Sequence, residues 1–291
     1  MRTIGWTRTA LLILAVAWAC GGRGSENGSD EAEPSAAPPS AGMEAGSDSL
    51  PAALLGAASP PRGETVNYYP ADPASAGYIV TPGGAGPHPA VILIHEWDGL
   101  NDRVRQVADA LADEGYVALA ADLYSGRVGT TREENIALVQ EARANPQASI
   151  ANLNAAVEYL RARDDVSGRV GTMGWCFGGG IALSYALGGE QHDATAIFYG
   201  SLVTDPDSLA ALDHEIYGTF AAEDDGIPPS QVEEFVAALR QAGVANDVHV
   251  YDAVDHGFWL WVDEDPEVRA EPALDAWTRL KAYLQRALGE T

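Results

Sequence analysis

The stretch from Gly168 to Gly189, "GRVGTMGWCFGGGIALSYALGG", decides the fold. Its first eight residues, 168–175, are typical of a strand, and residues 179–189 are typical of a helix. Between them lies a Gly-x-Cys-x-Gly sequence centred on Cys176, whose small flanking residues permit a tight turn. A strand that passes through a tight turn into a helix is the repeating unit of proteins with a parallel sheet.

The same alternation extends in both directions along the chain. A hairpin is predicted over 64–82, and buried strands are predicted at 89–96, 116–124, 193–200, 214–224 and 246–254. Apolar residues at helical spacing predict helices at 102–115, 131–145, 149–163, 228–243 and 272–288. The predicted fold class is therefore α/β, with a mostly parallel sheet flanked by helices on both faces.

The N-terminal region predicts export. Arg2 and Arg8 precede an apolar run over 10–19 that is too short to cross a bilayer, so residues 1–19 are interpreted as a signal peptide. The run ends at Cys20 in a sequence that resembles the lipobox of bacterial lipoproteins, which implies lipid attachment to Cys20 and a membrane anchor facing the periplasm or the cell exterior. The alternative is an ordinary cleaved signal peptide. Residues 20–62 are predicted to be a disordered linker, and 63–291 the folded domain.

Cysteine and charge counts limit the function. The chain contains two cysteines, so lipidation of Cys20 would leave Cys176 without a disulfide partner in an oxidising compartment, which favours a chemical role for Cys176. The formal net charge of −25 would repel nucleic acid, so a nucleic-acid partner is not expected.

Cys176 is the candidate nucleophile. A strand, a Gly-x-nucleophile-x-Gly turn and a helix form the nucleophile elbow of α/β-hydrolases, in which serine is common at the central position. The start of the helix would favour a thiolate, and the backbone N–H of Phe177 would be available to an oxyanion. The alternative is a buried cysteine beside a phosphate-binding turn, but the turn lacks both glycine patterns typical of such sites.

A nucleophile of this kind requires a base and an acid later in the chain. His256 follows a predicted strand and precedes Gly257, whereas His249 lies within that strand and is more typical of a structural histidine. The sequence "EDD" at 223–225 ends another predicted strand and supplies the acid. Asp224 is preferred, although spacing alone separates it poorly from Asp225.

A further polar cluster follows the strand at 89–96. His95 and Glu96 suggest metal ligands, but no second ligand pair lies at workable spacing, and adjacent residues on a strand point to opposite faces. Neither a metal nor another cofactor is therefore expected.

Five motifs together resemble the dienelactone hydrolase family of α/β-hydrolases. These are "HEWDGL" (95–100), "ADLY" (121–124), "GWCFGGG" (174–180), "EDDGIP" (223–228) and "DHGF" (255–258), and the resemblance extends over about 64–288. It implies a catalytic triad of Cys176, Asp224 and His256. It also implies that Glu96 holds the resting thiol and helps to deprotonate it, that a second oxyanion N–H lies near Trp97, and that Tyr124 lines the substrate pocket.

One position departs from this family. Members that cleave dienelactone carry an arginine four residues after the triad histidine, where this chain has Leu260. With Trp259 and Trp261, Leu260 suggests a more apolar substrate pocket, although Arg103, Arg105 or Arg127 could replace the missing arginine.

The expected function is hydrolysis of an activated small-molecule ester or lactone. The alternatives are a general carboxylesterase and a non-catalytic, surface-anchored binding protein with the same fold.

Overall fold

The computed structural model describes residues 49–289, which contain one sheet of eight strands. The strands are β1 (Glu64–Val66), β2 (Gly77–Val80), β3 (His88–Ile94), β4 (Val117–Ala121), β5 (Val166–Trp175), β6 (Ala194–Phe198), β7 (Ile216–Ala221) and β8 (Asn246–Tyr251). Their order across the sheet is β1-β2-β4-β3-β5-β6-β7-β8. β2 is antiparallel to β1 and β4, whereas all neighbours from β4 to β8 are parallel. The predicted hairpin and the mostly parallel sheet are both confirmed.

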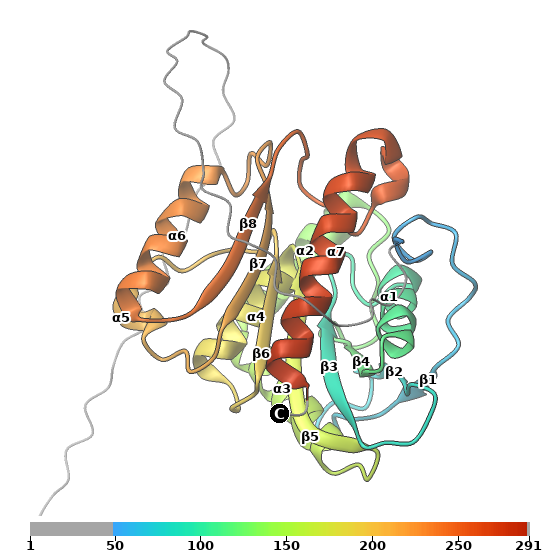
Figure 1. Cartoon of the computed structure of the whole chain (residues 1–291). Helices are drawn as coiled ribbons and strands as arrows, with labels where there is room; N and C mark the ends of the chain where they lie inside the picture. The colour runs from blue at the N-terminus through green and yellow to red at the C-terminus, as the bar shows by residue number, and fades with distance from the viewer. Residues whose placement is uncertain (1–48, 290–291) are drawn as a thin grey trace, which may run out of the picture. The chain divides into compact units, whose positions relative to one another are not determined.

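Helices cover both faces of the sheet (Figure 1). They are α1 (Asp102–Asp113), α2 (Arg132–Ala144), α3 (Pro146–Arg161), α4 (Phe177–Gly188), α5 (Pro206–Leu209), α6 (Pro229–Ala242) and α7 (Pro266–Leu288), with a short 3-10 helix η1 (Val262–Glu264). α1 and α7 pack against one face, and α3, α4 and α6 pack against the other.

Strand β3 explains how a continuous apolar run serves both faces. Val91 and Leu93 join the core cluster beneath α1 and α7, whereas Ala90, Ile92 and Ile94 join the cluster beneath α3. All five side chains are fully buried. Burial of a large aliphatic side chain contributes about 1.5–3 kcal/mol, so this alternation fixes β3 in the middle of the sheet.

The last helix begins earlier than predicted. The proline at 272 suggested a helix start, because proline is favoured in a first helical turn, but α7 begins at Pro266 and Pro272 lies inside it. Pro266 occupies the first-turn position instead. The additional turns bring Arg269 into a buried position.

The predicted boundary of the linker at residue 62 is also wrong. Ala53 and Leu54 are buried in the core cluster that contains α1 and α7. Arg62 donates to the Asp113 carboxylate at 2.6 Å. The physical reason is the apolar sequence "LPAALLGAA" (50–58), which buries enough surface to pack on the domain.

The predicted signal peptide and Cys20 lie outside the described residues. Within residues 49–289, no helix has both the length and the apolar composition needed to cross a bilayer.

Candidate active site

The predicted site residues follow the carboxyl ends of parallel strands. Glu96 follows β3, Tyr124 follows β4, Cys176 follows β5, Asp224 follows β7 and His256 follows β8. Because these strands are parallel, their carboxyl ends meet at one edge of the sheet, which is where sites form in open α/β sheets.

Cys176 lies in a strained turn between β5 and α4. Its φ of 53° and ψ of −115° place a residue with a side chain in a conformation that favours glycine. Its backbone N–H donates to the carbonyl of Phe198 on the neighbouring strand β6 at 3.0 Å. The side chain is partly exposed and forms no disulfide. The turn therefore presents the thiol at the start of α4, as the nucleophile-elbow sequence predicts.

Close backbone contacts explain the flanking glycines. A Cβ at Gly174 would lie 2.3 Å from the carbonyl oxygen of Gly178, and a Cβ at Gly178 would lie 2.2 Å from that of Ile94. Both distances are too short for any other residue without movement of the backbone. The start of α4 is therefore packed directly on β3 and on the turn itself.

His256 and Asp224 form a hydrogen-bonded pair. Nδ1 of His256 lies 2.6 Å from Oδ2 of Asp224, and the other carboxylate oxygen accepts backbone N–H groups of Gly226 and Ile227 at 2.8 and 3.2 Å. The Cys176 side chain interacts with the same imidazole and helps to raise its pKa. Asp224 is buried, whereas the His256 side chain is 41% exposed. The three residues thus form a continuous chain from a buried acid to the thiol.

The charges within this chain shift its pKa values. Burial alone would lower the pKa of His256, but hydrogen bonds to Asp224 and Cys176 outweigh it and raise that pKa. Burial alone would raise the pKa of Asp224, but the hydrogen bond from His256 outweighs it and lowers that pKa. The buried Asp224 carboxylate thus stabilises the protonated form of the His256 imidazole.

The alternative acid and base lie elsewhere. Asp225 is exposed, and no hydrogen bond joins it to His256. His249, on β8, lies 2.8 Å from Asp247 and 2.9 Å from Arg279 through Nε2. The structure therefore separates Asp224 from Asp225, which spacing in the sequence could not do.

Glu96 is a buried carboxylate beside these residues. It is 5% exposed, and its Oε2 accepts a hydrogen bond from the indole Nε1 of Trp261 at 2.8 Å. Burial raises the pKa of Glu96 from 4.5 to about 7, while the hydrogen bond from Trp261 and the charge of His256 oppose the rise. Glu96 is thus suited to gain or lose a proton near neutral pH.

Phe177, Tyr124 and Trp97 lie around the turn. Phe177 is the first residue of α4, and the backbone N–H groups of a first helical turn have no partner within the helix. The rings of Phe177 and Tyr124 lie 5.4 Å apart, and Trp97 packs against their cluster. Burial, and to a smaller extent Cys176, raises the pKa of Tyr124.

Leu260 is fully buried in the core cluster and offers no exposed surface to a substrate. Among the possible arginine replacements, Arg105 pairs with Asp102 and Arg127 with Glu141 at the surface. Arg103 lies with its guanidinium 4.6 Å from the centre of the Trp261 ring. The side chain of Trp261, and not that of the buried Leu260, forms a hydrogen bond with Glu96.

His95 is structural. Its Nδ1 lies 2.7 Å from the carbonyl oxygen of Glu96, and its Nε2 accepts the backbone N–H of Leu123 at 3.2 Å. Burial lowers the pKa of His95 to about 4, so the ring is neutral. Within residues 49–289, no three His, Cys, Asp or Glu side chains are grouped as metal ligands.

Two residues contact the site in the structure although the sequence does not predict these contacts. Tyr199, at the end of β6, packs edge-on against His256 with ring centres 4.9 Å apart, and it has a φ of 38°. The sequence predicts Trp261 only as a contributor to an apolar pocket. The position of Tyr199 after a strand was an available signal, whereas the Trp261 contact depends on a loop conformation.

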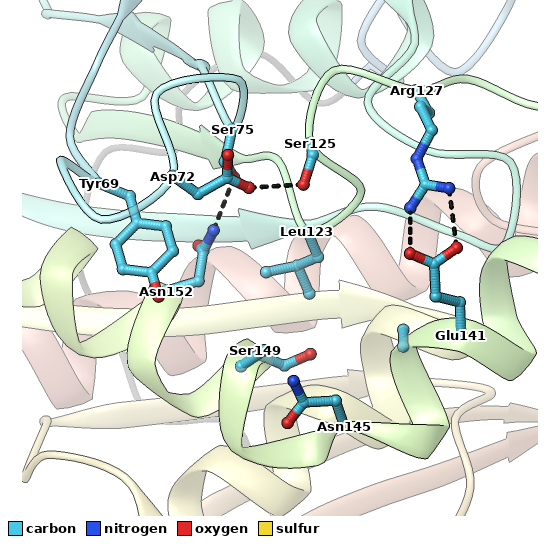
Figure 2. A pocket seen from close by; sticks show the side chains of 12 residues that line it. Tyr69, Asp72, Ser75, Leu123, Ser125, Arg127, Glu141, Asn145, Ser149 and Asn152 are labelled. Carbon is cyan, nitrogen blue, oxygen red and sulfur yellow. Dashed lines mark hydrogen bonds and ion pairs between the residues drawn. The ribbon is translucent and has the colours of Figure 1, made fainter.

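A polar cavity of about 170 Å³ lies between α2, α3 and the loop before β2 (Figure 2). Asp72 accepts from Ser125, Ser75 accepts from Asn152, and Arg127 pairs with Glu141 along its walls. None of the predicted site residues lines it.

The fold and the Gly-x-Cys-x-Gly turn define an α/β-hydrolase. Residues 75–288 match the Dienelactone hydrolase family, and the chain belongs to that family. It is a carboxylic ester hydrolase, as predicted.

Relatives support this assignment. A protein of Methylorubrum extorquens, assigned by name as a carboxymethylenebutenolidase, is 32% identical over 222 residues, which cover 72% of this chain and 76% of that protein. A protein of Synechocystis with the same name is 31% identical over 233 residues, which cover 73% of this chain and 92% of that protein. The solved structure of a Klebsiella pneumoniae protein described as a dienelactone hydrolase superposes with a TM-score of 0.63 at 28% identity, covering 73% and 93%.

Proposed function

We propose that the chain hydrolyses activated esters or lactones through a thioester on Cys176. The observation that carries the proposal is the Asp224–His256 hydrogen bond at 2.6 Å, with an imidazole that interacts with Cys176 and a thiol at the strained turn before α4. In this arrangement Cys176 is the nucleophile, His256 is the base and Asp224 is the acid that orients the base.

In the proposed reaction, Glu96 first accepts the proton of Cys176 Sγ, and the thiolate attacks the substrate carbonyl. The backbone N–H groups of Phe177 and of the Trp97 region stabilise the oxyanion. The leaving alkoxide or enolate departs as the carbonyl re-forms, taking a proton from His256. His256 then activates water, which hydrolyses the thioester and restores the enzyme.

The nucleophile limits the substrates. A thiolate leaves a tetrahedral intermediate more readily than a simple alkoxide, because thiols are much stronger acids than alcohols. An alkyl ester would therefore tend to revert, whereas aryl esters, enol lactones and thioesters have leaving groups that compete with sulfur. Leu260 stands where the dienelactone-cleaving relatives carry an arginine, so an uncharged acyl group is favoured over dienelactone.

The direct test is intact-mass detection of an acyl adduct during turnover of a panel of aryl esters, lactones and thioesters. We expect a transient adduct on Cys176, and a loss in kcat/KM of about 10³-fold or more for Cys176→Ala. Undiminished turnover by that variant would contradict the proposal, and faster turnover of alkyl esters by Cys176→Ser would favour a general carboxylesterase.

Asp224→Asn tests the acid against a matched neighbour. Because the amide would no longer hold the imidazole in its catalytic tautomer, kcat should fall by about 10²–10⁴-fold. Asp225→Asn, one residue away at an exposed position, should retain full activity. Equal activities for the two variants would remove Asp224 from the proposed triad.

We also propose that the chain is exported and anchored through a lipid on Cys20. The charged and apolar pattern of residues 1–20 supports this proposal. Membrane fractionation of the full chain and of Cys20→Ser would test it, since only the former should carry an acyl mass and sediment with membranes.

A further inference from the structure

Among the residues that the structure describes, Trp261 donates a hydrogen bond to the Glu96 carboxylate. Its indole Nε1 lies 2.8 Å from Oε2. Glu96 is 5% exposed, so water competes little for this contact. A charged acceptor in a buried position makes such a hydrogen bond strong and directional.

The indole is itself held on several sides. The Trp261 backbone N–H donates to the Gly257 carbonyl at 3.1 Å, and its carbonyl accepts from Arg269 at 2.7 Å. The Arg103 guanidinium stacks 4.6 Å from the centre of the indole ring. Arg103 is anchored in turn by Asp263, at 2.8 and 3.0 Å, and by the carbonyl of Ala53.

We infer that Trp261 is a positioning residue that fixes the Glu96 carboxylate for the thiol, and that Arg103 orients the indole. The inference rests on the proposed function, in which Glu96 accepts the thiol proton. That step breaks the S–H bond of Cys176 and forms an O–H bond on Glu96, so a thiolate and a carboxylic acid replace a thiol and a carboxylate.

A neutral donor suits this step better than a cation in direct contact. A guanidinium paired with Glu96 would strongly favour its ionised form and weaken it as a base. The indole N–H fixes the carboxylate in place without a formal charge, while the cation of Arg103 is kept behind the ring. The other titratable groups that interact with Glu96 are Asp98 on its own loop, His256, Tyr199 and Glu264.

The test measures the rate at which Cys176 is alkylated by iodoacetamide as a function of pH, which requires no substrate. Trp261→Phe retains a ring above Arg103 but removes the donor. The alkylation rate should fall on the acidic side of the pH profile, and this fall is the acidic limb. Because the hydrogen bond lowers the pKa of Glu96, its loss should shift the acidic limb to higher pH by about one pH unit. Alkylation should then be slower by about tenfold at pH 6 and unchanged at pH 9.

The matched control is Trp259→Phe. Trp259 lies two residues earlier, is fully buried, and its indole Nε1 has no hydrogen-bond partner in the structure. This variant loses an equivalent indole N–H and should keep the wild-type acidic limb. Arg103→Leu should shift the limb in the same direction as Trp261→Phe but by less, because the donor remains and only its support is lost.

Failure of the inference differs from failure of the proposed function. An unshifted limb in Trp261→Phe, or an equal shift in Trp259→Phe, overturns the role of Trp261. If Glu96→Gln keeps the wild-type limb, Glu96 does not accept the thiol proton and the inference falls with that step. Turnover by Cys176→Ala would overturn the proposed function by itself.

Discussion

Glu96 shows how one buried side chain connects stability with chemistry. Its carboxyl is more basic in the folded protein than in the unfolded chain, because burial disfavours its charge. The folded state therefore binds this proton more tightly than the unfolded state does. Stability from this group is fully present below pH 4.5 and is lost as the pH rises through about 7.

Glu96→Gln should remove this dependence while keeping an oxygen acceptor for Trp261. At pH 8 we expect the variant to be more stable than the wild type by about 1–3 kcal/mol, with little difference at pH 4.5. Urea unfolding at the two pH values measures this. Glu133→Gln, an exposed position on α2, should show the same difference at both. A constant difference for Glu96→Gln would contradict the prediction.

The residues of the site differ in how far sequence could place them. Cys176 and His256 were predictable, because each follows a strand and is flanked by glycine. Asp224 and Asp225 have equal chemistry and adjacent positions, so only the conformation of the loop after β7 distinguishes them. The Trp261–Glu96 contact joins residues 165 positions apart, and no local pattern encodes it.

At the scale of elements, the junction of β5 and α4 determines where the thiol lies. α4 begins at Phe177, so close to β3 that Gly178 lies against the carbonyls of Ile94 and His95. The glycine-rich sequence predicted a tight turn, but not which backbone it approaches. The helix start and the strand that precedes Glu96 are therefore in direct contact.

Gly178→Ala should disrupt this contact. The added Cβ would lie 2.2 Å from the Ile94 oxygen and 2.5 Å from the His95 oxygen, both backbone atoms that cannot move independently. We expect a loss of about 2 kcal/mol or more in the free energy of unfolding, because overpacking forces backbone shifts. Thermal and urea unfolding measure it.

Gly188→Ala is the control within the same helix. A Cβ there would meet no atom within 4 Å, and alanine is a better helix former, so stability should be unchanged or slightly raised. Equal losses for the two variants would show that the close approach at Gly178 does not limit stability.

At the scale of the whole molecule, the segment before β1 belongs to the folded unit. Leu54 is fully buried, the carbonyl of Ala53 accepts from Arg103, and Arg62 pairs with Asp113. The sequence suggested a linker here because alanine, proline and glycine dominate it. Its few apolar residues were sufficient to pack once a groove between α1 and α7 was available.

A chain that begins at residue 63 should therefore be less stable than one that begins at residue 49. Loss of the buried Leu54 side chain alone should cost about 2–5 kcal/mol. Calorimetric Tm values of the two chains measure the effect. Equal Tm values would show that residues 49–62 contribute nothing to the fold.

The positive φ of Cys176 has a consequence for how this enzyme class can change its chemistry. The strain arises from the backbone and the Cβ, which cysteine, serine and alanine share, so exchange among them leaves the conformational cost nearly constant. The turn thus fixes the position of the nucleophilic atom whether that atom is sulfur or oxygen. Sulfur and oxygen can therefore replace each other at this position without a new fold.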